Sequence, residues 1–208
     1  MTFPAASPAT SIRSEQPFRS GAAQAQTHRL LGDGLIRHVV ADVYVARDVP
    51  DSMPVRAEAA ALLVPPKRRQ ERSWVVGFAS AAWVYTGWWA PVELPGDPDV
   101  RAEPCEPRLD LIVSAGRGRP LDPWIRARQG RLHAAEIVVI RGLPISDPVR
   151  TAADLAREFP AAAALGMLRR LGELAQVTPD QVLHQLTTMR YARGAARARA
   201  VIEAWQEG

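Results

Sequence analysis

Residues 136–156, EIVVIRGLPISDPVRTAADLA, constrain the fold more than any other stretch of this chain. The first five residues are rich in β-branched side chains and predict a strand that is buried on at least one face. The dipeptide Arg141-Gly142 supplies a turn into a second short strand at 143–146. Asp147 is placed to cap a helix, and Pro148 occupies its first position, where a missing N–H costs nothing. The stretch therefore predicts strand, turn, strand and helix, and it contains no catalytic motif.

The length of 208 residues and the 47% hydrophobic content predict one or two globular domains. A run of about 18 apolar residues is absent, so we expect no membrane-spanning segment. Residues 1–16 lack the basic start and apolar core of a signal peptide and predict a disordered tail, which indicates a cytoplasmic protein. The single cysteine, Cys105, excludes an internal disulfide.

The net charge of +4 favours a polyanionic partner only weakly, because 25 of the 26 basic residues are arginine and a GC-rich coding bias gives the same skew. The four histidines are scattered along the chain and do not form a zinc-binding pattern. Neither a catalytic pair of carboxylates nor a Ser/His/Asp order is evident. We therefore expect a protein that is not an enzyme and that needs no metal or cofactor.

Residues 17–48 predict a winged helix-turn-helix. Short helices are expected over 21–26 and 27–31, followed by two strands within 35–45 that are joined by a tight turn near Ala41-Asp42. In such a domain the second helix enters the DNA major groove and the hairpin lies against the backbone. The candidate DNA-binding residues are Arg19, His28, Arg29, Arg37 and His38. A small helical cap leading into a sheet is the alternative interpretation.

Residues 49–160 predict a mixed α/β domain with a small sheet, and residues 161–208 predict a helical segment that packs on it. Strands are expected at 74–76, 109–113 and 124–128, and helices at 53–64, 78–87, 161–176 and 179–189, before a last helix. Thr178 and Gln181 form a capping box at the start of one of these helices. The predicted fold class is α+β.

Three further groups of charged residues are candidates for contacts. Arg117 and Arg119 lie in a Gly-x-Gly turn whose spacing does not match a nucleotide-binding loop, but they could touch a nucleic-acid backbone. Arg190, Arg193 and Arg197 form either a solvated helix face or a patch that contacts phosphate or a protein partner. Arg150 and Asp154 share one face of a helix, where they are expected to brace the helix against the sheet.

Several motifs carry a resemblance to a known family. They are Phe18-Arg19-Ser20, Val43-Tyr44-Val45, Val49-Pro50-Asp51-Ser52, Ala81-Ala82-Trp83, and above all Gly142-Leu143-Pro144-Ile145 with Pro148-x-Arg150-Thr151-x-x-Asp154-Leu155-Ala156. In this order they resemble actinobacterial proteins related to AbiEi-type antitoxins of type IV toxin–antitoxin systems, over about residues 17–206.

The resemblance implies an N-terminal winged-helix DNA-binding domain and a C-terminal α/β antitoxin-like domain. It implies an autoregulating repressor that binds double-stranded DNA at its own promoter and counters a nucleotidyltransferase toxin encoded beside it. Many relatives continue into an endonuclease domain similar to very-short-patch repair enzymes, whereas this chain stops at Gly208.

One departure bears on DNA binding. Relatives usually show a Gly and an Arg before the Val-Tyr of the wing, where this chain has Ala41-Asp42, and an acid there would repel phosphate. Two alternatives therefore stay open beside the regulator. One is a protein-interaction module without DNA binding, either an antitoxin or a nuclease accessory subunit, and the other is an inactive relative that has lost its nuclease domain.

Overall fold

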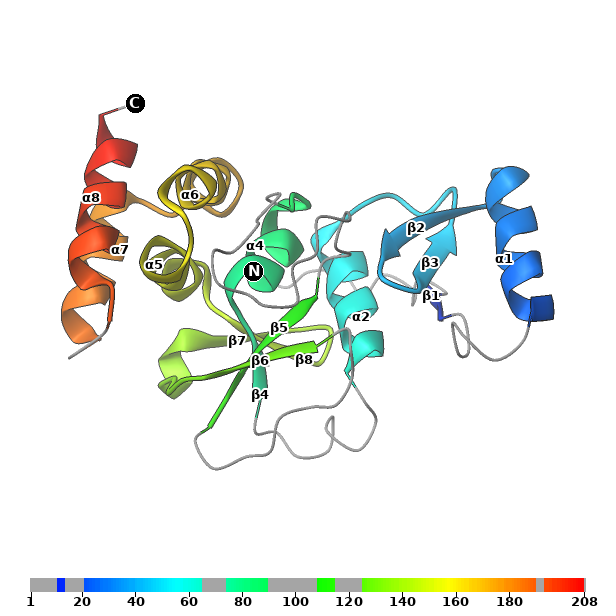
Figure 1. Cartoon of the computed structure of the whole chain (residues 1–208), viewed down its shortest axis with the longest axis horizontal. Coiled ribbons are helices and arrows are strands. Elements are labelled where there is room, and N and C mark those ends of the chain that lie inside the picture. Colours follow the sequence, from blue (N-terminus) through cyan, green and yellow to red (C-terminus); the bar gives the residue numbers. More distant parts are fainter. Residues whose placement is uncertain are drawn as a thin grey trace.

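The computed structural model describes residues 11–13, 21–64, 74–89, 108–114, 125–189 and 193–207. These residues form an α+β arrangement of three groups along the long axis of the molecule (Figure 1). A helix and a small sheet lie at one end, a larger mixed sheet lies in the middle, and a cluster of helices lies at the other end.

The N-terminal group consists of β1 (Ser11–Arg13), α1 (Gly21–Gly32), β2 (Ile36–Val40) and β3 (Val43–Ala46). The three strands are antiparallel in the order β1-β3-β2. The predicted hairpin is confirmed, since Val40 pairs with Val43 across the turn. The apolar side of this hairpin packs against α2 (Met53–Leu63), where Val43 and Ala57 are both fully buried.

Two predictions for this group are wrong. The two short helices are one continuous helix, α1, because neither Gly nor Pro stands near residue 26 to end the first of them. The described residues 21–48 thus contain one helix before the hairpin, and they show no helix-turn-helix. Residues 11–13 were expected in a disordered tail, but they form β1 because the edge of β3 accepts their backbone.

The central group contains β4 (Trp74–Val76), α4 (Phe78–Thr86), β5 (Leu109–Val113), β6 (Ile125–Gln129), η1 (Ala134–Glu136), β7 (Ile137–Ile140) and β8 (Leu143–Ser146). Its strands follow the order β6-β5-β4-β8-β7 in the described part of the chain. The pairs β5/β6 and β4/β8 are parallel, and the other two pairs are antiparallel. Arg141 and Gly142 both adopt positive φ, of 51° and 77°, as a tight two-residue hairpin turn requires.

The helical group contains α5 (Pro148–Glu158), α6 (Ala161–Ala175), α7 (Pro179–Thr188) and α8 (Ala195–Gln206). Both predicted N-terminal caps are confirmed: Asp147 accepts from the N–H groups of Val149 and Arg150, and Thr178 forms a capping box with Gln181. These helices bury a second apolar core against α4 and β5, separate from the core that joins the sheet to α2. Helices long and apolar enough to span a membrane are not found in the described ranges.

Candidate functional site

The candidate DNA-binding residues fall into two groups in the structure. His28 and Arg29 lie on the exposed side of α1 near its end. Arg47, which the sequence analysis did not single out, is exposed just after β3. Arg19 lies outside the described residues. Helix α1 and the end of the hairpin therefore present basic side chains to solvent.

Arg37 and His38 instead make contacts within the N-terminal group. Arg37 donates from Nε and Nη2 to the carbonyl oxygen of Val49, at 3.3 and 3.1 Å, and so ties β2 to the loop before α2. His38 places Nε2 2.6 Å from the carbonyl oxygen of Ala41, and its ring meets Tyr44 edge-on. His38, although exposed, thus bonds the hairpin turn, whereas Arg37 fixes the hairpin to the loop before α2.

The acid in the hairpin turn is not presented to solvent. Asp42 is only 6% exposed, although a residue at a wing tip would be expected to project outward. Burial therefore keeps this carboxylate from direct contact with a phosphate group at the hairpin turn.

The C-terminal candidate arginines lie at the opposite end of the molecule from α1, because α8 and α1 mark the two ends of the long axis (Figure 1). Arg193 and Arg197 are exposed at the start of α8, and the carbonyl oxygen of Arg193 accepts from Arg157 Nε at 2.9 Å. Arg117, Arg119 and Arg190 lie outside the described residues. The two basic groups that the structure describes therefore form separate surfaces.

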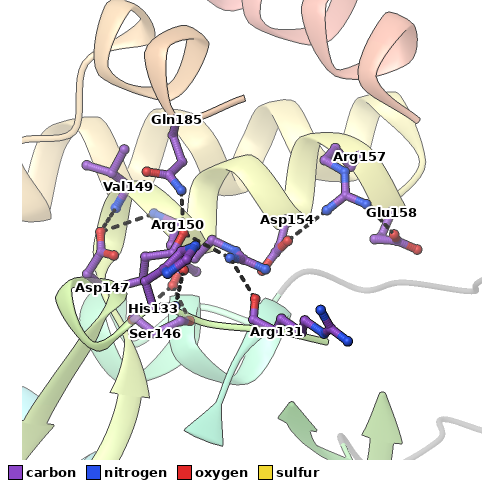
Figure 2. A network of polar contacts seen from close by, with 12 residues as sticks. Arg131, His133, Ser146, Asp147, Val149, Arg150, Asp154, Arg157, Glu158 and Gln185 are labelled. Atoms are coloured by element: carbon purple, nitrogen blue, oxygen red, sulfur yellow. Dashed lines mark hydrogen bonds and ion pairs between the residues drawn. The ribbon is translucent and has the colours of Figure 1, made fainter. Parts of the chain in front are cut away.

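A buried ionic network centres on Arg150 (Figure 2). Arg150 Nε donates to Asp154 Oδ2 at 2.9 Å, and Nη1 donates to Glu136 Oε1 at 2.9 Å and to the carbonyl oxygen of Arg131 at 3.2 Å. Arg150, Asp154 and Glu136 are 6%, 1% and 8% exposed. The predicted helix-face pair is therefore part of a larger cluster that joins α5 to η1.

The network continues into the other helices. Glu136 also accepts from the N–H of His133 and from Gln185 Nε2 on α7. Asp154 forms a second ion pair with Arg157, whose Nη1 donates to Oδ1 at 3.0 Å, and Arg157 Nε donates to the carbonyl oxygen of Arg193, two residues before α8. These bonds fix α5, α7 and the start of α8 relative to the sheet. Neither Glu136 nor Gln185 could be identified from the sequence, because the Glu136–Arg150 and Glu136–Gln185 contacts span 14 and 49 residues.

The electrostatics of the network indicate a structural role. Burial raises the pKa of Glu136, but the bonds from His133, Arg150 and Gln185 outweigh it and hold the pKa below its usual 4.5. Burial raises the pKa of Asp154 against the opposing effect of Arg150 and Arg157. Burial lowers the pKa of Arg150, but Asp154 and Glu136 raise this pKa by more than burial lowers it. The guanidinium therefore stays charged. These buried groups do not offer an exposed acid or base for catalysis.

A second buried ion pair lies between the sheet and the helices. Asp110 on β5 is 2% exposed and accepts from Arg128 Nε at 3.1 Å, and burial raises the pKa of this carboxyl despite Arg128 and Arg126. The Arg128 guanidinium lies over the rings of Phe78 and Phe159, at 4.7 and 5.7 Å from their centroids. Sequence analysis missed this pair, since only the parallel register of β5 and β6 brings the two residues together.

Among the described residues, groups of three or more His, Cys, Asp or Glu side chains that could hold a metal ion are not found. The geometry thus defines an α+β protein with a helical cluster that buried ion pairs fix onto a mixed sheet.

This chain belongs to the AbiEi antitoxin family, because the AbiEi antitoxin C-terminal domain matches residues 75–204. The match covers the central sheet and the helical group, including the whole Arg150 network. The resemblance inferred from the Gly-Leu-Pro-Ile motif and the helix after it is therefore confirmed.

Comparisons with curated proteins and with solved structures add less to the identification than the family match. No curated protein matches the chain. The chain is similar to a solved structure, the crystal structure of the RV2827C protein from Mycobacterium tuberculosis, with 17% sequence identity and a TM-score of 0.43. That alignment covers 88% of this chain and 65% of the other, so the chain spans about two thirds of that structure's length.

Proposed function

We propose that this protein is the antitoxin of a type IV toxin–antitoxin system and that it also represses its own promoter by binding double-stranded DNA. The observation that carries the antitoxin role is the family match over residues 75–204. We assign the countering of a cognate toxin, encoded nearby, to this matched part, and we assign DNA binding to the residues before it. The proposed role is regulatory, and the protein acts without catalysis in the cytoplasm.

The N-terminal group supports the DNA-binding role by its shape and charge. A helix followed by a β-hairpin is the part of a winged helix that meets DNA, with the helix in the groove and the hairpin on the backbone. Exposed His28, Arg29 and Arg47 supply hydrogen-bond donors for phosphate, two of them permanently charged. Arg37 contributes by fixing β2 to the loop before α2, and His38 contributes by bonding the hairpin turn. Arg19 remains a candidate from the sequence alone.

A gel-shift experiment on the upstream region of the gene tests DNA binding. We expect the full chain to bind, and we expect Arg29→Ala with Arg47→Ala to weaken binding by at least about tenfold. The matched control is Arg169→Ala with Arg170→Ala on α6, which removes the same charge from another exposed surface. Absence of a shift at low salt, or an equal loss in both double variants, would contradict the proposal.

Co-expression with the product of the adjacent gene tests the antitoxin role. We expect the full chain to restore growth of cells that express the toxin, and the Arg29→Ala, Arg47→Ala variant to restore it equally. Loss of DNA binding with retained protection would separate the two functions. Failure of the wild-type chain to protect would contradict the antitoxin role.

One observation favours a second candidate, a protein-interaction module without DNA binding. Two of the predicted DNA contacts, Arg37 and His38, already make hydrogen bonds within the chain, to the carbonyl oxygens of Val49 and Ala41, and residues 21–48 contain a single helix. In that case the chain would protect cells and would not shift DNA at any salt concentration. The pair of experiments above therefore distinguishes the two candidates.

A further inference from the structure

Helix α1 has a sheltered side and an exposed side. Thr27, Leu30 and Leu31 are half-buried, and they share one side because they recur at spacings of three and four residues. The exposed residues of this part of α1 are Ala25, Gln26, His28 and Arg29. Helix α1 stands at one end of the molecule, beside β2 (Figure 1). Its exposed side chains are therefore open to a large ligand such as DNA.

Gln26 differs from its basic neighbours in what it can recognise. A glutamine amide offers both hydrogen-bond donors and an acceptor, whereas a guanidinium only donates. Within the part of the chain that the structure describes, the Gln26 side chain has no hydrogen-bond partner. A phosphate oxygen only accepts, so it would use the donors of the amide and leave the amide oxygen unpaired. The best match for Gln26 is a group that presents a donor and an acceptor side by side.

Adenine presents such a pair of groups in the major groove of DNA. Its N7 accepts and its N6 amino group donates, and a glutamine amide pairs with both at once. His28 cannot do so, because its two ring nitrogens point in different directions. Arg29 has no acceptor and instead fits phosphate or guanine. Among the exposed residues of α1 that the structure describes, Gln26 is thus the match for adenine.

The position of Gln26 along α1 also favours contact with bases. Residues near the N-terminus of a helix in the major groove meet the base edges. Gln26 lies in the first half of the 12-residue helix, and Arg29 lies one turn further toward the C-terminus. Ala25, beside Gln26, is small and permits close approach of the helix to the groove. Gln26 is therefore placed nearer to the bases than Arg29.

Given the DNA binding proposed above, we infer that Gln26 determines sequence specificity by pairing with one adenine of the bound DNA. Its Nε2 donates to adenine N7, and its Oε1 accepts from the adenine N6 amino group. Arg29 binds a phosphate group nearby and adds affinity without sequence preference. Specificity and affinity thus belong to neighbouring residues and can be measured separately.

A base-substitution series tests this inference in the full chain. Each base pair of the DNA fragment that the wild type binds is replaced in turn, and fluorescence anisotropy gives the dissociation constants of the wild type and of Gln26→Ala. For each bound chain we expect one A·T pair whose replacement weakens the wild type at least about fivefold and the variant less than about twofold. All other positions should affect both proteins equally. Gln129→Ala, at an exposed position on β6, is the matched control and should keep the wild-type pattern.

The salt dependence separates base reading from phosphate binding. The slope of log binding constant against log salt should be unchanged in Gln26→Ala, because a neutral amide releases no counterion, and should become shallower by about 0.9 in Arg29→Ala. Arg29→Ala should also keep the A·T preference. Titrations that start at low salt keep the binding of both variants measurable.

Three results would count against this assignment in different ways. A wild type that binds no DNA at low salt would contradict the proposed function itself. Binding with the same base-pair pattern in the wild type and in Gln26→Ala would overturn the assignment of Gln26 and leave DNA binding intact. A base preference that is lost in Arg29→Ala and kept in Gln26→Ala would likewise overturn it. An unchanged far-UV spectrum would show that both variants are folded.

Discussion

The N-terminal group and the helical group are attached to the central sheet by different forces. The N-terminal hairpin packs through apolar side chains such as Val43 against α2, with Arg37 bonded to the carbonyl of Val49. The helical group has an apolar core as well, but it adds the buried ion pairs of Arg150 and Asp154. Apolar contacts are non-directional, whereas a buried charge requires its partner in one position. The helices are therefore held in one position, whereas the hairpin is attached mainly by non-directional contacts.

The largest expected effect follows from removing the centre of the network. Arg150→Ala leaves the carboxylates of Asp154 and Glu136 without their shared partner, so we expect the free energy of unfolding to fall by about 3–5 kcal/mol. Urea denaturation followed by circular dichroism measures it. Arg197→Ala, at an exposed position, should change stability by no more than about 0.5 kcal/mol. A loss below about 1 kcal/mol for Arg150→Ala would show that the apolar core alone fixes the helices.

A second prediction concerns the pH dependence of the same network. The pKa of Glu136 lies below its usual 4.5 in the folded protein, so its stabilising effect is fully present above pH 4.5. As the pH falls below that value the unfolded chain takes up the proton first, and the effect is lost. The raised pKa values of Asp110 and Asp154 make their effect on stability change with pH in the direction opposite to that of Glu136. The effect of Glu136 is therefore isolated by comparing the wild type with a Glu136 variant at each pH.

Glu136→Gln provides that comparison. We expect the variant to be less stable than the wild type at pH 7 by about 1–3 kcal/mol, and the gap to narrow as the pH falls below 4.5. Urea denaturation at a series of pH values measures the gap. Glu173→Gln, at an exposed position on α6, should give little difference at any pH. A gap that is constant with pH would mean that the charge of Glu136 does not matter.

Sequence alone predicted the parts of the fold that depend on neighbouring residues. The Arg141-Gly142 turn and the Asp147 cap act within a few residues, and the structure forms both as expected. The continuity of α1 was missed because short Ala-rich segments carry no clear boundary. Glu136 was read only as the start of a strand, since its bond to Arg150 depends on how α5 docks. Long-range polar contacts of this kind have no local signal.

A third and smaller effect is expected in the N-terminal group. Arg37→Ala removes the bonds to the Val49 carbonyl, and we expect a loss of about 1–2 kcal/mol. Hydrogen exchange should show faster opening of β2 and β3, while the amides of α5 keep their protection. Equal loss of protection in both groups would mean that the hairpin and the helices open as one unit.

The smallest effect on stability should accompany a clear effect on binding. Arg29 and Arg47 are exposed, so replacing both by Ala should change the free energy of unfolding by no more than about 0.5 kcal/mol. If each contacts one phosphate, the slope of log binding constant against log salt should become shallower by about 1.8, since each neutralised phosphate contributes about 0.9. Binding titrations at several salt concentrations measure this slope, with the Arg169, Arg170 double variant as control. A shallower slope with unchanged stability would show that the charges of Arg29 and Arg47 contribute to binding and not to stability. The charge of Arg150, in contrast, stabilises the fold. An unchanged slope would place the DNA contacts elsewhere on the chain.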